Sequence, residues 1–379
     1  MSRLVISFVL AAVASGTIAL NRQAQKPTPV LSPSPSPSPS PSPTPLSEVQ
    51  EIFRTTTEEV RIPVFASDDY GNSDPSIDAN DILVLEDGVP QEIKSVQRLP
   101  GSITLLLSTS GDGNPVMRTN LTRDIALNLI SHLRSGDQIS ILQFTSRVEL
   151  LQDWTSDQSL LEHALRSKLH SGSGSRLAPA LIQAAAQLRK QPIGDRHLVV
   201  IGDGVDVPPW ATYRELMKAL DPGEADEIKA RSEMAVAVKE LNATRASIFF
   251  ISYQQWATQV FHGKATPESS HGADGIRFDP AMKRLRKAYE HGMAMGGQRL
   301  NDLTAETGGR LLLGTSSDEM VRQGREVARD IGAQFVITYK PKRPLSTSAA
   351  DEYRRLDVAS RRVGLHLRTR RGYIVNKAL

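Results

Sequence analysis

The sequence predicts an α/β fold with a doubly wound, mostly parallel sheet, preceded by a small β-rich module and followed by a β extension. Three short apolar runs have the length and composition of buried parallel strands, at 103–107, 197–201 and 247–251. Stretches with helical periodicity of their apolar residues separate these runs. Because strands that alternate with helices build parallel sheets, we expect the segment 101–340 to form the α/β domain.

The N-terminal part of the chain has a different composition. In residues 1–25 the positively charged Arg3 precedes an uncharged run from Leu4 to Leu20. This pattern indicates a signal peptide or an N-terminal membrane anchor. Residues 26–47 hold nine of the 23 prolines, mostly alternating with serine. Because proline fixes φ and lacks a backbone donor, this segment is predicted to be an extended linker. We therefore expect an exported protein, in the periplasm, on the outer surface or outside the cell.

Composition excludes several classes of protein. The chain has 379 residues and no cysteine, so a disulfide scaffold, a zinc–thiolate centre, an iron–sulfur cluster and a thiol nucleophile are ruled out. The formal net charge of +3 is too small to require nucleic acid, and aromatic residues, at 5%, are too few for a base-stacking platform. We predict neither a nucleic-acid partner nor a small-molecule substrate.

The β-rich module is predicted at 48–100. Alternation of apolar and polar residues in 60–65, and in part in 82–85, indicates strands. Residues 86–90 are typical of a turn, and a strand pattern resumes at 93–99. A segment of this size forms only a minimal core, so the module is expected to pack on the α/β domain.

The elements of the α/β domain follow in order. Helices are predicted near 120–133, 157–168, 175–189, 211–219, 225–242, 280–293, 297–307 and 318–331. Besides the three apolar runs, strands are predicted at 138–144 and 148–154, as a hairpin, and at 310–313 and 334–339. Residues 254–280 show no clear period and are predicted to be loop-like.

The C-terminal segment 341–379 is predicted to be a basic β extension, with strands at 353–358 and 364–375. Between Lys340 and Lys377 there are eleven Lys or Arg and three Asp or Glu. One interpretation is a surface that contacts anionic lipid headgroups or cell-wall polymers. The other is a solvated sheet face whose charges prevent edge aggregation. The candidate anionic-surface residues are Arg361, Arg362, Arg368, Arg370 and Arg371.

Three polar loops border strands of the predicted sheet, at 108–112, 172–175 and 203–206. The first directly follows the apolar run 103–107, and the third follows the run 197–201. Because the carboxyl ends of parallel strands face one edge of a sheet, we expect the loops to meet there. Their hydroxyls and carboxylates form a hard-oxygen set that suits Mg²⁺, Mn²⁺ or Ca²⁺.

Four motifs, in order along the chain, carry a resemblance to a known family. They are ILVLEDGVPQ at 82–91, LVVIGDGVD at 198–206, LTAETGGR at 303–310, and a tail from YRRLDV at 353–358 to RRGY at 370–373. On these motifs the chain resembles the von Willebrand factor type A domains, and in particular the bacterial variant described chiefly from Acidobacteria. The resemblance implies a Rossmann-like doubly wound sheet and an exported N-terminus.

The family's metal-ion-dependent adhesion site consists of a D-x-S-x-S loop, a distant Thr and the Asp of a D-G turn. By the resemblance, Ser110 matches the middle Ser and Asp203 the last Asp. Ser108 stands where the first Asp belongs, Asp112 where the last Ser belongs, and Ser175 where the Thr belongs. A hydroxyl cannot replace a carboxylate's charge at a divalent cation. Two alternatives follow: Asp112 restores that charge and metal binds, or the loop keeps its shape without metal.

The resemblance implies a non-enzymatic adhesion or scaffolding protein that binds a protein partner at the edge formed by the three loops. Asp206 and Trp210 follow Asp203 and are predicted to contact that partner. One alternative is a structural envelope protein that contacts anionic surfaces through its basic C-terminal segment. Another is a metal-assisted hydrolase that uses Asp112 and Asp203, although no histidine lies near them in the sequence to act as a general base.

Overall fold

A computed structural model of the chain describes residues 58–74, 76–110, 115–206, 215, 224–261, 280–349 and 351–375. The predicted signal segment 1–25 and linker 26–47 lie outside these ranges, as does the helix predicted at 211–219 apart from Glu215. The described residues belong to the unit Thr56–Leu379. Among the helices within the described ranges, none has the length and hydropathy needed to cross a bilayer.

A six-stranded sheet forms the centre of the α/β domain and confirms the predicted fold class. Its strands lie in the order β10-β9-β8-β5-β6-β7, and every neighbouring pair is parallel except β6 and β7. The strands are β5 (Ser102–Ser108), β6 (Gln138–Phe144), β7 (Val148–Thr155), β8 (Arg196–Gly202), β9 (Ser247–Ser252) and β10 (Leu311–Leu313). All residues of β5, β8 and β9 are buried, as the apolar runs predict.

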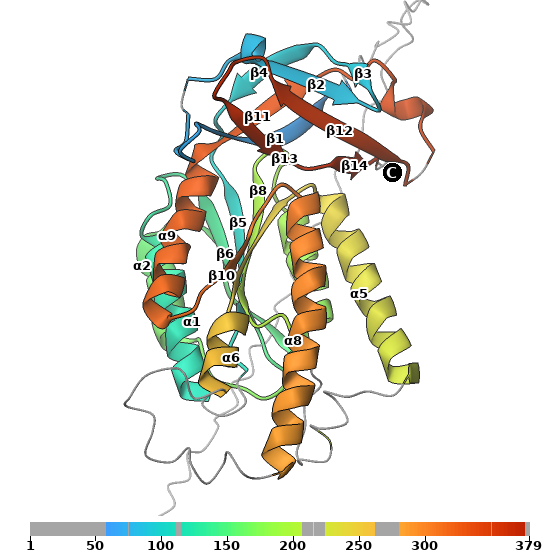
Figure 1. Cartoon of the computed structure of the whole chain (residues 1–379). Helices are drawn as coiled ribbons and strands as arrows, with labels where there is room; N and C mark the ends of the chain where they lie inside the picture. Colours follow the sequence, from blue (N-terminus) through green and yellow to red (C-terminus); the bar gives the residue numbers. More distant parts are fainter. Residues whose placement is uncertain are drawn as a thin grey trace, which may run out of the picture. The chain divides into compact units, whose positions relative to one another are not determined.

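Helices cover both faces of this sheet (Figure 1). One face packs against α1 (Pro115–Ile130), α2 (Gln158–Ser167) and α9 (Ser317–Ala333). The other packs against α3 (Leu177–Arg189), α5 (Glu224–Thr244) and α8 (Pro280–Glu306). Strand β5 shows why both faces are filled: Leu105 belongs to the first apolar core and Leu106 to the second, because successive strand residues point to opposite faces.

Local signals explain where the helices begin and end. Helix α2 begins after Asp157, whose carboxylate accepts the backbone N–H groups of Ser159 and Leu160. Two helices differ from the predictions. Residues 254–261 form helix α6 (Gln254–Phe261) instead of a loop, and the helices predicted at 280–293 and 297–307 are one helix, α8. At Gly296 an added Cβ would lie 2.7 Å from the Gly204 carbonyl oxygen, so glycine there permits close packing and does not break the helix.

The β-rich segments before and after the α/β domain form two four-stranded sheets that share one core. One sheet has the order β13-β1-β11-β4 and the other β14-β12-β2-β3. Their strands are β1 (Val60–Ser67), β2 (Ile82–Glu86), β3 (Val89–Pro90), β4 (Ile93–Gln97), β11 (Gln334–Tyr339), β12 (Tyr353–Ser360), β13 (His366–Thr369) and β14 (Gly372–Ile374). The strand predicted at 334–339 to end the α/β sheet is therefore β11 of this sandwich. Its alternation suits either sheet, and sequence cannot show that β1 and β4 pair with it.

A buried carboxylate ties the two ends of the sandwich together. Glu86 is 3% exposed and accepts hydrogen bonds from Tyr339 Oη at 2.6 Å and Tyr373 Oη at 2.8 Å. It also pairs with Arg354 Nη1 at 2.6 Å, and Arg354 is fully buried. Burial and the nearby Glu86 carboxylate raise the pKa of both tyrosines. This one carboxylate therefore holds β11, β12 and β14 to β2.

Replacing Glu86 by alanine would leave the Arg354 guanidinium buried without its carboxylate. We expect Glu86→Ala to lower the free energy of unfolding by about 3–5 kcal/mol, measured by urea denaturation. The control is Lys239→Ala, which removes an exposed pair with Asp351 and should leave the free energy of unfolding almost unchanged, because water screens such pairs. Equal losses in the two variants would contradict a structural role for the Glu86 network.

Candidate functional site

The carboxyl ends of β5 and β8 lie side by side. Leu107 is opposite Ile201 in the parallel register, so Ser108 at the end of β5 lies beside Gly202 at the end of β8. An added Cβ on Gly202 would come within 2.9 Å of Ser108 Cβ, which explains the glycine at this position. The first and third predicted loops are thus neighbours.

The second loop reaches the same edge through two contacts. Ser110 forms an isolated parallel bridge with Gly172, whose N–H donates to the Thr109 carbonyl at 3.4 Å. Arg176 N–H donates to the carbonyl of Thr145, which follows β6, at 2.9 Å. The described residues of all three predicted loops therefore meet at one edge of the sheet, as parallel-strand geometry predicts.

The serine hydroxyls at this edge are buried. Ser108 Oγ and Ser110 Oγ lie 3.2 Å apart, within hydrogen-bonding distance. Ser108, Ser110 and Ser175 are 2%, 7% and 5% exposed, and Ser175 Oγ has no partner within the described ranges. Hydroxyls with so little exposed surface are not accessible to a protein partner. They are part of the packed interior at this edge of the sheet.

The carboxylate of Asp203, the predicted metal ligand after β8, forms an ion pair that sequence reasoning did not predict. Arg118 Nη1, on α1, lies 3.0 Å from Asp203 Oδ2, and the two side chains are only 7% and 5% exposed. Asp203 Oδ1 accepts the backbone N–H of Val205 at 3.1 Å. A buried guanidinium–carboxylate pair of this kind cancels the charge of Asp203 within the protein.

Helix α1 is fixed against the strand end by a second set of contacts. Thr122 Oγ1 donates to the Ser108 carbonyl or to the Arg118 carbonyl, which lie 3.0 Å and 2.9 Å away. The same hydroxyl is hydrogen-bonded to Tyr253 Oη, and burial raises the pKa of Tyr253. The first turns of α1 are thus anchored at the end of β5, which places Arg118 beside Asp203.

The described donors do not fit Mg²⁺, Mn²⁺ or Ca²⁺. Ser108, Ser110 and Ser175 bring no charge, and the Asp203 carboxylate already binds a guanidinium that would repel a second cation. Within the described ranges no group of three His, Asp or Glu side chains could hold a metal ion. Asp112, the other predicted ligand, lies outside those ranges.

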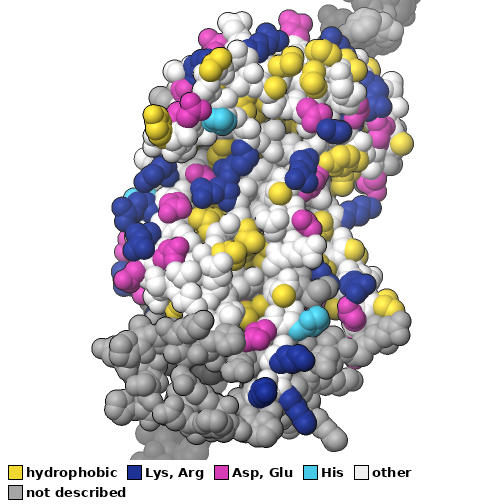
Figure 2. Space-filling model, in the orientation of Figure 1, with side chains coloured by type: hydrophobic (Ala, Val, Ile, Leu, Met, Phe, Trp, Pro, Cys, Tyr) yellow, Lys and Arg dark blue, Asp and Glu magenta, His cyan; other side chains and the backbone are white. Residues whose placement is uncertain are grey.

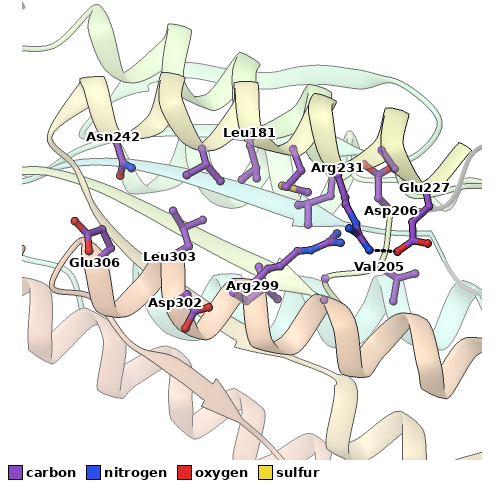
Figure 3. A pocket seen from close by; sticks show the side chains of 18 of the residues that line it. Leu181, Val205, Asp206, Glu227, Arg231, Asn242, Arg299, Asp302, Leu303 and Glu306 are labelled. Atoms are coloured by element: carbon purple, nitrogen blue, oxygen red, sulfur yellow. Dashed lines mark hydrogen bonds and ion pairs between the residues drawn. The ribbon is translucent and has the colours of Figure 1, made fainter. Parts of the chain in front are cut away.

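A groove with a volume of about 680 Å³ adjoins this edge, between α5 and α8 (Figure 3). Leu177 and Leu181 of α3 and Leu303 of α8 give it an apolar lining, and Gly204–Asp206, the loop after β8, forms part of its wall. Asp206 pairs with Arg176 Nε at 3.4 Å and accepts the N–H of Ala178 at 3.2 Å. Burial raises the pKa of Asp206, an effect that the Ala178 N–H and Arg176 partly offset.

Two arginines face each other across this groove. In Figure 3, Arg231 of α5 and Arg299 of α8 extend from opposite walls toward one another. Glu227 pairs with Arg231 at 2.5 Å. Arg299 is exposed and forms no ion pair with any residue that the structure describes. Of these two arginines only Arg231 has an ion-pair partner among the described residues, so Arg299 offers a cation above the apolar floor. Asp302 and Glu306 also line the groove.

The other predicted site residues lie in different surroundings. Arg362 pairs with Asp74 and Asp81, and Arg368 pairs with Asp330 at 3.0 Å. Arg370 is 2% exposed, whereas Arg361 and Arg371 are exposed. On the face shown in Figure 2, Lys and Arg side chains of the sandwich are interspersed with Asp and Glu. The five candidate arginines thus do not form one free basic surface, and Trp210 lies outside the described residues.

Sequence reasoning missed Arg118 and the groove. The sequence did hold a signal for Arg118. With Ser108 in place of an aspartate, a buried Asp203 needs a single positive charge beside it. Helix α1, which carries Arg118, begins just after the loop that contains Ser108. The groove had no such signal, because its walls come from helices far apart in the chain. Only the packing of α3, α5 and α8 brings them together.

Comparison with known families identifies this part of the chain. The family model of the von Willebrand factor type A domain matches residues 105–205, which include Ser108, Ser175 and Asp203. No curated protein matches the chain. The resemblance to the von Willebrand factor type A domain is therefore confirmed for residues 105–205, and the finer likeness to the variant from Acidobacteria stays a prediction.

Three solved structures illustrate the similarity. The PilB minor pilin from Streptococcus sanguinis has 12% identity and a TM-score of 0.39, over 62% of each chain. The von Willebrand factor type A protein from Catenulispora acidiphila has 10% identity and a TM-score of 0.41, over 85% of this chain and 74% of that one. The vWF domain of the type V pili tip protein Mfa5 from Porphyromonas gingivalis has 17% identity and a TM-score of 0.27, over 29% and 40%. This chain thus spans less than two thirds of PilB and of the Mfa5 domain, and the family assignment rests on the match at 105–205.

The Arg118–Asp203 pair generates a stability prediction. Arg118→Met keeps most of the side-chain volume but leaves the Asp203 carboxylate buried without its cation. We expect the free energy of unfolding to fall by about 3–5 kcal/mol in urea denaturation. Arg325→Met, on the exposed side of α9, should change it by less than about 0.5 kcal/mol. A loss in Arg118→Met no larger than in this control would show that the pair has no structural role.

Proposed function

The chain contains a von Willebrand factor type A domain, and from that premise we propose that it is a non-catalytic, exported interaction module that binds a protein partner in adhesion or scaffolding. The observation that carries the proposal is the groove between α5 and α8, which opens beside the loop that follows β8. Concave surfaces that are mostly apolar and carry a few convergent polar groups are typical ligand-binding sites. The predicted partner-binding edge thus continues into an accessible surface.

The groove suits a partner better than the polar cluster does. Ser108, Ser110 and Asp203 are less than a tenth exposed, so they offer little surface for contact. By contrast, the loop residues Gly204 to Asp206 line the groove directly. Asp206 therefore keeps its predicted role as a partner contact in this proposal, and the cluster around Asp203 positions the loop that carries it.

The occupant we propose is an amphipathic helix of the partner with an acidic side chain at its centre. The two walls are helices, and the floor between them is apolar, which is the setting in which a helix lays its apolar face into a groove. Arg299, which pairs with no carboxylate that the structure describes, can receive one carboxylate of the partner beside Arg231. Such a charge fixes the register of the helix and selects against basic segments.

Loop 203–206 and helix α8 are connected by one side chain. Gln254 Nε2 lies 2.9 Å from the Asp203 carbonyl and 2.9 Å from the Met293 carbonyl of α8, so it can donate to both. At Gly297 an added Cβ would lie 2.7 Å from Gln254 Oε1, so the helix presents a glycine to this side chain. The groove wall is therefore rigidly connected to the edge of the sheet, which favours a preformed binding surface.

Catalysis is not part of the proposal. A metal-assisted hydrolase would need Asp203 as a metal ligand or base, and that carboxylate is paired with Arg118 in a buried position. Of the five candidate arginines that would serve an envelope protein in contact with anionic surfaces, Arg362 and Arg368 are engaged in ion pairs with Asp74, Asp81 and Asp330, and Arg370 is buried. Export is proposed from the signal-like residues 1–25 and the linker 26–47.

Affinity capture with matched variants tests the proposal. The full chain is immobilised, and proteins retained from an envelope extract are quantified by mass spectrometry. We expect a protein that the wild type retains and that Arg299→Glu retains on the order of tenfold less, because the reversed charge repels its carboxylate. The control is Arg284→Glu, an exposed position of α8 outside the groove, which should retain the protein as the wild type does. Retention unaffected by Arg299→Glu would exclude the groove as the binding surface.

A further inference from the structure

We propose that the guanidinium of Arg118 is a built-in cation that replaces the divalent metal ion of the adhesion site. The inference rests on the family assignment and on the described residues, and it is independent of the partner proposed for the groove. The inference starts from a difference between this chain and the family's motif. The chain keeps the Asp of the D-G turn, Asp203, but has Ser108 where the motif has its first aspartate. The Asp203 carboxylate pairs with the guanidinium of Arg118.

The charges balance under this substitution. In the motif that the chain resembles, two carboxylates face one divalent cation. Among the described residues of this set, one carboxylate, Asp203, faces one guanidinium. Replacing an aspartate by Ser108 removes one negative charge, and replacing a divalent ion by Arg118 removes one positive charge. The two replacements compensate each other, so the buried Arg118–Asp203 pair is neutral; Asp112, which stands where the last Ser belongs, lies outside the described residues.

The geometry matches this role. The guanidinium lies 3.0 Å from the Asp203 carboxylate, with both side chains almost fully buried. The hydroxyl of Ser108 pairs with that of Ser110 at 3.2 Å and so has a partner without a metal ion. Thr122 Oγ1 lies within hydrogen-bonding distance of the Ser108 and Arg118 carbonyls and can donate to either, which holds α1 and its cation beside the end of β5. An arginine stays protonated at any physiological pH, so this cation is permanent.

A permanent cation changes how the edge responds to its surroundings. A metal site is filled or emptied by the ion concentration, whereas an arginine cannot dissociate. The loop from Gly204 to Asp206 therefore stays in one position whether or not divalent ions are present. We expect the stability of the protein to be insensitive to EDTA and to added Mg²⁺ or Mn²⁺.

The first experiment titrates the full wild-type chain with MnCl₂ by calorimetry and follows its Tm with Mn²⁺ and with EDTA. We expect no saturable heat up to millimolar Mn²⁺ and no change of Tm beyond about 1 °C. A saturable heat that Asp203→Asn abolishes would overturn the proposal, because a metal ion would then bind at the carboxylate that we assign to Arg118.

The second experiment exchanges the cation. In the double variant Ser108→Asp with Arg118→Ser, the aspartate of the motif returns and the guanidinium leaves. We expect Mn²⁺ to raise the Tm of this variant by several degrees, reversibly with EDTA. The control is Ser108→Asp with Arg325→Ser, which has the same net charge and keeps Arg118; Mn²⁺ should not stabilise it. A folded double variant, by circular dichroism, with no response to Mn²⁺ would contradict the exchange. If that variant does not fold, the wild-type titration decides alone.

Discussion

The buried ion pair between Arg118 and Asp203 is the interaction on which the geometry of the edge depends. It joins the start of α1 to the end of β8, and it lies beneath the loop that shapes one wall of the groove. Buried ion pairs contribute little net stability, because desolvation offsets their attraction. Separating the two groups would leave a buried charge uncompensated, so the pair holds α1 beside the end of β8. The loop Gly204–Asp206 is positioned as a result.

The β-sandwich fixes the other end of helix α8, at the amino ends of the parallel strands. The Arg371 N–H donates to the Glu306 carbonyl at the end of α8 at 2.9 Å, and both residues line the groove. At Gly308 an added Cβ would lie 2.7 Å from the Thr369 carbonyl carbon, so α8 ends directly against β13. The Glu86 network holds this sandwich closed. The β segments are thus part of what fixes α8, and not separate appendages.

Much of the fold could be predicted from sequence, because it depends on local pattern. The apolar runs at 103–107 and 197–201 are strands of the sheet, and Asp157 caps its helix. What could not be predicted depends on distant contacts. The strand 334–339 alternates in a way that suits either sheet, and only its pairing with β1 and β4 assigns it to the sandwich. At the edge, parallel-strand geometry brought the three loops together, but the role of Arg118 required knowledge of its position beside Asp203.

A double-mutant cycle between Arg118 and Asp203 tests the central claim most directly. The free energies of unfolding of the wild type, Arg118→Met, Asp203→Asn and the double variant are measured in urea. If the guanidinium acts as the cation of this carboxylate, the double variant should be more stable than the sum of the two single losses predicts, by about 2–3 kcal/mol. Losses that simply add would mean that the two charges do not depend on each other, and the account of this edge would be wrong.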